Sequence, residues 1–468
     1  MLFTEPIFFA FFAAVFAVAW LERSHGRRKL WLLGASYLFY AGWDWRFLSL
    51  IAASTLIDYL AGRGLGRFGG AASRRALLLT SLAVNLGLLG LFKYYGFFVE
   101  SAVGLLSALG LEPVARVPAI VLPVGISFYT FQTLSYTIDI YRGKLEPVRN
   151  LVDFALFVGF FPQLVAGPIV RAADFLPQLE RPPRWSDVAI RRDLTLFLVG
   201  FVKKACIADN VAPFADRLFA APETFTALAV WTGVALYAVQ IYCDFSGYTD
   251  MAIACAGLLG YRLARNFDFP YLASSVADFW HRWHVSLSTW LRDYLYVPLG
   301  GSRGSRLATH RNLMLTMLLG GLWHGAAWTF VAWGLLHGLA LAAHREWRRL
   351  ASPRLPALPG GRLLATALTL HWILLTWIFF RAQSFADAAV LARAFLLFQS
   401  PGPRTLDPAL LFLVVLLVAV HLLSASNRLE EAVERFPDWA FAGAYGAAAA
   451  LAVFFLPLRT EAFIYFQF

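Results

Sequence analysis

Long apolar runs recur along the whole chain, with short polar stretches between them, and this pattern predicts helices rather than strands. The predicted helices cover residues 7–21, 31–43, 46–61, 76–92, 118–138, 151–169, 193–211, 226–246, 248–261, 311–323, 326–343, 363–380, 407–424 and 439–457. About 20 apolar residues span a bilayer, so the 468 residues allow on the order of ten crossings. The short runs 151–169 and 311–323 are candidates for re-entrant segments, which are tolerated where protein or a water-filled cavity surrounds them.

The composition excludes a soluble globular protein and a disordered one. Charged residues make up 15% of the chain, against roughly 25% in ordinary soluble domains, and hydrophobic residues reach 59%. This much apolar surface has to face lipid. With no internal repeat and no domain linker, we expect a single all-α, polytopic integral membrane domain over residues 1–468, with about 11–14 membrane-embedded helices.

Charge in the loops predicts a topology. The loops 22–29 and 62–75 are rich in Lys and Arg, whereas the link 42–46 carries one cation, so we expect an external N-terminus and cytoplasmic loops at 22–29 and 62–75. Most of 142–192 and 262–311 is also expected to be cytoplasmic. Basic cytoplasmic loops near anionic lipid explain the net charge of +11. We therefore expect no nucleic-acid partner.

Ionisable groups inside apolar runs are costly, so each is a candidate for function. His324 lies deep in an apolar segment, with Gly320, Gly321 and Gly325 around it and with Trp323 and Trp328 as walls. A neutral imidazole there can act as a base near pH 7. The alternative is a core histidine that bonds a carbonyl group across a helix interface. The glycines would let another helix or a ligand approach closely.

A second candidate is the stretch from Asp278 to Ser288. Asp278, His281, His284 and Ser288 recur at i, i+3, i+6 and i+10, which predicts that they share one helix face. Two histidines at i, i+3 without a glutamate are a poor metal signal, and we expect no metal. The alternative is an interfacial amphipathic helix with its His, Arg and Trp side chains at the headgroups.

A third candidate is the stretch from Tyr242 to Met251, in which Asp244 and Asp250 enclose Ser246 and Gly247. It lies between two predicted helices. It reads as a helix–turn–helix near the site or as a short loop. His337, His371 and His421 lie alone at apolar runs, and for these we favour structural roles.

Several separated motifs together resemble the membrane-bound O-acyltransferase family, in the family's order and over roughly residues 30 to 385. They are Pro123–Phe131, Leu164–Ile169, Cys243–Met251, Phe279–Ser288, Leu291–Gly301, Gly321–Gly325 and Trp377–Ala382. The residues of these motifs are most similar to those of the bacterial branch that O-acetylates alginate, other polysaccharides and peptidoglycan.

The resemblance implies a ring of helices around a central tunnel that reaches the family's essential histidine, which His324 matches. His284 matches the family's second histidine, and Arg282 matches the basic residue before Trp283. Both histidines are therefore expected to be catalytic. We assign Trp323, Trp280, Arg282, Asp244 and Ser288 to the channel for substrate and donor. Arg282, Arg292, Arg303 and Arg306 are candidates for holding the donor's phosphates.

The expected function is acetyl transfer from a cytoplasmic thioester, acetyl-CoA or an acyl-carrier thioester, across the bacterial inner membrane to an extracytoplasmic polysaccharide. No bound cofactor is expected. An SGNH-type acetyltransferase that uses a serine hydroxyl, periplasmic or surface-anchored, is the expected partner. Two alternatives stay open: a D-alanyl or lipid O-acyltransferase of the same family, and a transporter or flippase that uses its histidines for gating.

Overall fold

In a computed structural model, the chain folds into two compact units. One consists of Met1–Asp193 and Ala252–Ala264, and the other of Leu194–Met251 and Arg265–Phe468. The structure describes every residue except 112–119, 166, 351–359, 426–432, 458–462 and 465–468. The regular elements of this described part are helices, which agrees with the predicted all-α class. Part of the predicted helix 118–138 lies outside the described residues.

The first unit contains the N-terminal helices. They are α1 (Pro6–Leu21), α2 (His25–Asp44), α3 (Leu48–Arg67), α4 (Ala71–Leu89), α5 (Tyr95–Ala108), α6 (Ile126–Tyr141), α7 (Leu151–Gly159), α8 (Phe161–Leu164) and α9 (Ala172–Leu179). Short turns add η1 (Trp45–Phe47), η2 (Gly90–Tyr94) and η3 (Trp185–Asp187). The run predicted over 151–169 is divided between α7 and α8, and residues 154–164 of these helices are buried.

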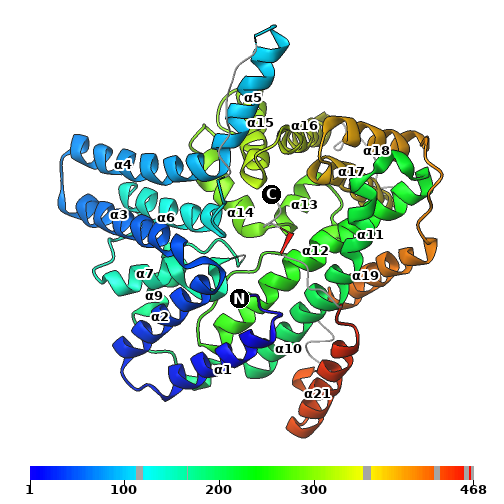
Figure 1. Cartoon of the computed structure of the whole chain (residues 1–468). Coiled ribbons are helices and arrows are strands. Elements are labelled where there is room, and N and C mark those ends of the chain that lie inside the picture. Colours follow the sequence, from blue (N-terminus) through cyan, green and yellow to red (C-terminus); the bar gives the residue numbers. More distant parts are fainter. Residues whose placement is uncertain (112–119, 166, 351–359, 426–432, 458–462, 465–468) are drawn as a thin grey trace. The chain divides into compact units, whose positions relative to one another are not determined.

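A buried carboxylate joins three of these helices, which lie side by side in Figure 1. Asp58 on α3 is fully buried and accepts hydrogen bonds from Ser81 and Asn85 on α4 and from Thr137 on α6. The Asn85 amide lies 2.8 Å and the Thr137 hydroxyl 3.2 Å from the carboxylate oxygens. Since a buried charge is tolerated only when its oxygens find donors, this network explains how an acidic residue fits inside an apolar bundle.

The second unit contains the helices that carry the candidate site. They are α11 (Asp209–Ala220), α13 (Val276–Arg282), α14 (Val285–Leu291), α15 (Arg306–His324), α16 (Trp328–Leu350), α17 (Gly361–Arg381), α18 (Phe385–Leu397), α19 (Leu411–Ser424) and α21 (Asp438–Phe454). Helices α10 (Ile190–Phe201) and α12 (Ala227–Leu258) carry residues of both units. Short turns are η4 (Val202–Ala208), η5 (Pro222–Thr224), η6 (Pro270–Leu272), η7 (Arg292–Tyr296) and η9 (Pro408–Leu410).

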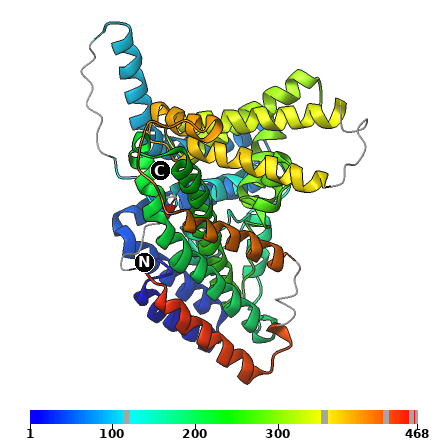
Figure 2. The same ribbon diagram turned by 90° about the vertical axis from the view of Figure 1, so that its right-hand side faces the viewer.

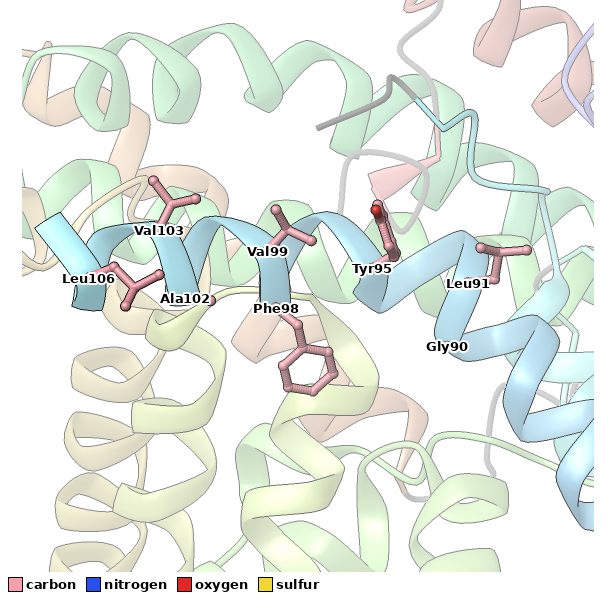
Figure 3. Close-up of a pocket in the computed structure, with 8 residues that line it drawn as sticks. All are labelled: Gly90, Leu91, Tyr95, Phe98, Val99, Ala102, Val103 and Leu106. Carbon is pink, nitrogen blue, oxygen red and sulfur yellow. The ribbon is translucent and has the colours of Figure 1, made fainter. Parts of the chain in front are cut away.

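Three helical segments of the described part are long and apolar enough to cross a membrane: Ala71–Ala108, Ala227–Leu258 and Gly361–Arg381. Three shorter apolar helices are Pro6–Leu21, Pro408–Ser424 and Asp438–Phe454. The first of the long segments exposes an apolar face. An open hollow of about 500 Å³ on η2 and α5 is lined by residues such as Leu91, Phe98 and Val103 (Figure 3). We expect lipid to cover it. The number of 11–14 embedded helices stays a prediction.

Candidate active site

His324 is the last residue of α15, at the point where the chain turns back into α16. The two helices lie side by side (Figure 2) and are held very close by glycines. A Cβ atom at Gly321 would collide with the Phe330 carbonyl oxygen, and one at Gly334 would collide with the Met317 carbonyl oxygen. The glycines were expected to let either another helix or a ligand approach closely. Gly321 allows the close approach of a second helix. The ring of Phe330 likewise fills the space beside Gly325.

Aromatic rings enclose His324, whose exposed fraction is 2%. The ring centroids of Trp323 and Trp333 lie 5.1 Å and that of Phe380 lies 5.3 Å from the imidazole centroid. Trp323 was predicted from its position next to His324, whereas Trp333 and Phe380 come from α16 and α17 and were not. Trp328 is 55% exposed, so the wall comes mainly from the other rings.

His284 lies at a break between two short helices rather than on a helix face. Helix α13 ends at Arg282, and His284 precedes α14 with a φ of 45°. His281 is exposed, whereas His284 is fully buried. The prediction that Asp278, His281, His284 and Ser288 share one face was therefore wrong, because the periodicity argument assumes an unbroken helix. A left-handed backbone in a residue other than glycine is strained, and such strain clusters at functional sites.

The strained turn is held by a neighbouring segment that sequence reasoning missed. The backbone of Asn266 accepts a hydrogen bond from Val285 at 2.9 Å, and the backbone of Asp268 donates to Arg282 at 2.9 Å. The Asn266 side-chain oxygen lies 3.3 Å from Nδ1 of His284 and also accepts from the Ser286 hydroxyl at 2.7 Å. In the sequence, Asn266 is a single amide in an aromatic stretch. It follows no residue spacing that would mark a functional site.

The fold brings the two predicted histidines together. The ring centroids of His284 and His324 lie 6.3 Å apart, and Trp323 contacts both rings, at 6.0 Å from His284. Phe245 of α12 stands perpendicular to His284 at 4.7 Å. Buried imidazoles in an aromatic setting can exchange protons with a bound hydroxyl group while water is kept away.

Trp280 lies behind one of the rings that enclose His324. Its Nε1 donates to Nδ1 of His337 at 3.2 Å, and Trp333 lies 4.7 Å from that histidine and 5.1 Å from His324. Trp280 and His337 therefore support one wall of the site through Trp333. Ser288 is half-buried and donates to the Trp283 carbonyl oxygen at 3.2 Å.

Asp244 lies on an unbroken helix. The chain from Tyr242 to Met251 is part of α12, so the prediction of a turn or loop was wrong. Gly247 allows α10 to pack closely against α12, because a Cβ atom at Gly247 would lie 2.6 Å from the Gly200 carbonyl oxygen. The acidic residues meet lysines of η4, with Asp244 2.7 Å from Lys204 and Asp250 2.7 Å from Lys203.

Arg282 is fixed by a local ion pair. Its Nε donates to Asp278 at 2.7 Å, and Nη1 donates to the Asp268 carbonyl oxygen at 3.1 Å. Burial raises the pKa of Asp278, but the hydrogen bonds from Arg282 and from the Ser274 backbone outweigh it and hold that pKa below its usual value. Arg282 is therefore an anchored cation rather than a mobile one.

The other candidate arginines differ in their partners. Arg292 pairs with Asp293 at 2.7 Å, and Arg306 pairs with Glu346. Arg303 is exposed and forms no ion pair within the described residues. No group of three or more His, Cys, Asp or Glu side chains that could hold a metal ion was found in the described part of the chain.

Comparison with known proteins identifies the class. The model of the MBOAT, or membrane-bound O-acyltransferase, family matches residues 144–359, a range that contains both histidines. The chain belongs to this family of membrane proteins and is an acyltransferase.

Curated relatives narrow the comparison. The chain is 44% identical to a probable alginate O-acetylase of Azotobacter vinelandii, over 82% of this chain and 76% of the relative. It is 37% identical to the peptidoglycan O-acetyltransferase of Helicobacter pylori, over 83% of this chain and 78% of the relative. A teichoic acid D-alanyltransferase of Streptococcus thermophilus is 28% identical over 48% of this chain and 57% of the relative.

Proposed function

We propose that this acyltransferase moves an acetyl group from a cytoplasmic thioester, acetyl-CoA, across the bacterial inner membrane for O-acetylation of an extracytoplasmic polysaccharide such as alginate or peptidoglycan. The observation that carries the proposal is the pair of buried imidazoles, 6.3 Å apart, inside an aromatic wall. The extensive similarity to two O-acetylating relatives, at 44% and 37% identity, supports acetyl as the acyl group.

His324 is the general base in this proposal. It takes the proton from the acceptor hydroxyl while the hydroxyl oxygen attacks the thioester carbonyl carbon, and a tetrahedral oxyanion forms. The carbon–sulfur bond then breaks, and the departing thiolate receives the proton from the imidazolium. The Trp323 indole N–H stabilises the oxyanion, because a dry site makes such a hydrogen bond strong, and His284 accepts a hydrogen bond at Nε2 that orients the acceptor hydroxyl.

The donor and the acceptor reach the site from opposite faces of the membrane. Arg303 is exposed in a segment expected to be cytoplasmic, where it can attract the phosphates of acetyl-CoA. An acetyl group has only two carbons and passes a narrow channel more easily than a sugar chain. We therefore propose that the immediate acceptor is the serine hydroxyl of a separate SGNH-type acetyltransferase, periplasmic or surface-anchored, which modifies the glycan.

Reconstitution tests the proposal. Sealed vesicles containing the full chain receive labelled acetyl-CoA on the side corresponding to the cytoplasm, with the partner enzyme and glycan on the other. We expect label on the partner and the glycan, and a loss of roughly 10²–10⁴ in rate for His324→Ala. The His281→Ala variant is the matched control, because His281 is exposed and lies outside the ring cluster.

Three outcomes would contradict parts of the proposal. Near-normal transfer by correctly inserted His324→Ala would exclude His324 as the base. Efficient glycan acetylation without the partner would exclude the relay. Transport of label with no covalent transfer would favour a flippase.

A further inference from the structure

A short C-terminal segment enters the core of the second unit. Phe463 and Ile464 have exposed fractions of 0% and 1%. The backbone N–H of Ile464 donates to a carboxylate oxygen of Asp244 at 2.6 Å. A residue 220 positions away in sequence is thereby attached to the middle of α12.

The carboxylate that makes this bond is part of a buried charge cluster. Lys204 lies 2.7 Å from Asp244 and 2.6 Å from Asp209, and all three side chains are at most 4% exposed. One lysine thus faces two carboxylates. A charge-assisted bond from a backbone N–H is roughly twice as strong as a neutral one, so Asp244 is a firm attachment point for the segment.

The attached segment touches the site. The Phe463 ring lies 4.9 Å from Tyr248 and 5.8 Å from Phe245, both on α12. Phe245 in turn stands perpendicular to the His284 ring at 4.7 Å. A continuous line of contacts therefore runs from Asp244 through the C-terminal segment to the histidine.

We propose that Asp244 is a positioning residue for acyl transfer: it holds Phe463–Ile464 against Phe245, and this packing keeps the His284 ring in place beside His324. The inference rests on the proposed roles of the two histidines. Misplacing a reacting group by an ångström can lower a rate by about a hundredfold, so loss of the attachment acts on kcat.

The structure offers a matched pair for the test. Asp244 and Asp209 both pair with Lys204 and are at most 4% exposed, and among the contacts of the described residues the Ile464 N–H donates to Asp244. Asp244→Leu and Asp209→Leu make the same chemical change to the same lysine. Asp244→Asn removes the charge but keeps an oxygen that can accept from Ile464.

We expect Asp244→Leu to lower kcat for acetyl transfer about tenfold to a hundredfold with little change in KM for acetyl-CoA. Asp244→Asn recovers most of this loss, and Asp209→Leu keeps kcat near wild type for the inserted, folded fraction. Equal losses of kcat in Asp244→Leu, Asp244→Asn and Asp209→Leu would overturn the proposal, because charge alone would then explain the effect.

A second measurement does not depend on acetyl transfer. The full chain is made with benzoylphenylalanine in place of Phe463, irradiated, digested and analysed by mass spectrometry. We expect a cross-link to the α12 peptide that contains Phe245 and Tyr248, lost in Asp244→Leu and kept in Asp209→Leu. A cross-link that survives in Asp244→Leu would overturn the attachment. An inactive wild type with this cross-link pattern would instead count against the proposed function.

Discussion

The side-chain oxygen of Asn266 lies 3.3 Å from Nδ1 of His284, and the same oxygen accepts from the Ser286 hydroxyl at 2.7 Å. An amide oxygen can only accept, so the imidazole carries its proton on Nδ1 in this arrangement. Nε2 is then the nitrogen with the lone pair. Asn266 thus sets both the tautomer and the ring orientation of a histidine whose backbone is already strained at a φ of 45°.

This relationship predicts a large effect from a residue that touches no substrate. We expect Asn266→Ala to lower the acetyl-transfer rate by about tenfold to a hundredfold, because the His284 ring loses its orienting bond. Ser286→Ala is the matched control: it removes another bond to the same oxygen and leaves Asn266 free to accept from His284. Steady-state kinetics on purified vesicles decide. Equal rates for the two variants would contradict the role of Asn266.

The sequence identified the two histidines that the fold brings together, whereas it did not identify the residues that surround them. His324 and His284 were found because an ionisable group in an apolar run and a known motif both identify a residue without reference to its neighbours. Their partners Asn266, Trp333 and Phe380 come from other segments, and no local spacing marks them. Sequence patterns report the period of a helix, whereas the wall of a site depends on which helices pack together.

The wrong predictions share one cause: a pattern that looked local in the sequence arises from contacts with other segments of the chain. Ser246 and Gly247 looked like a turn, but α12 continues through them because Gly247 admits Gly200 of α10. The opposite error concerns Trp283 and His284. The sequence there has the spacing of a continuous helix, but the helix is broken at these residues. There the Asn266 segment supplies hydrogen bonds that compensate for the break. Helix propensity is a weak preference that such packing overrides.

The close approach of α15 and α16 predicts a strong effect on stability. We expect Gly321→Ala to destabilise the protein by about 1–3 kcal/mol, because the new methyl group meets the Phe330 carbonyl oxygen and α16 has to move. Gly446→Ala on α21 is the control, since nothing lies within 4 Å of its added carbon. Thermal unfolding in detergent measures both. An unchanged melting temperature for Gly321→Ala would contradict the tight helix contact.

Arg303 differs from the neighbouring arginines and predicts a selective effect on the donor. We expect Arg303→Gln to raise KM for acetyl-CoA about threefold to tenfold with kcat unchanged, because one charge-assisted phosphate contact is lost. Arg292→Gln should leave KM near wild type, since Asp293 already pairs with Arg292 at 2.7 Å. Initial rates over a range of acetyl-CoA concentrations test this. A larger KM effect at Arg292 would reverse the assignment.

Helix α3 provides the sharpest test of topology, because the expected topology requires it to cross the membrane although it is not among the three most clearly apolar long segments. Its 20 residues, Leu48–Arg67, correspond to about 30 Å, which matches the hydrocarbon thickness of a bilayer. Its one buried acidic residue, Asp58, is satisfied by α4 and α6, so the helix can lie in lipid despite this charge. Trp45 precedes it and Phe68 follows it, with exposed fractions of 73% and 51%.

We therefore expect these two positions to be on opposite sides of the membrane. In a background in which Cys206, Cys243 and Cys255 are replaced, an impermeant maleimide should label Trp45→Cys in intact cells and Phe68→Cys only after permeabilisation. The physical reason is the cluster of arginines around Phe68, which the positive-inside rule retains in the cytoplasm. Labelling of Phe68→Cys from outside would invert the topology, and with it the direction of acetyl transfer.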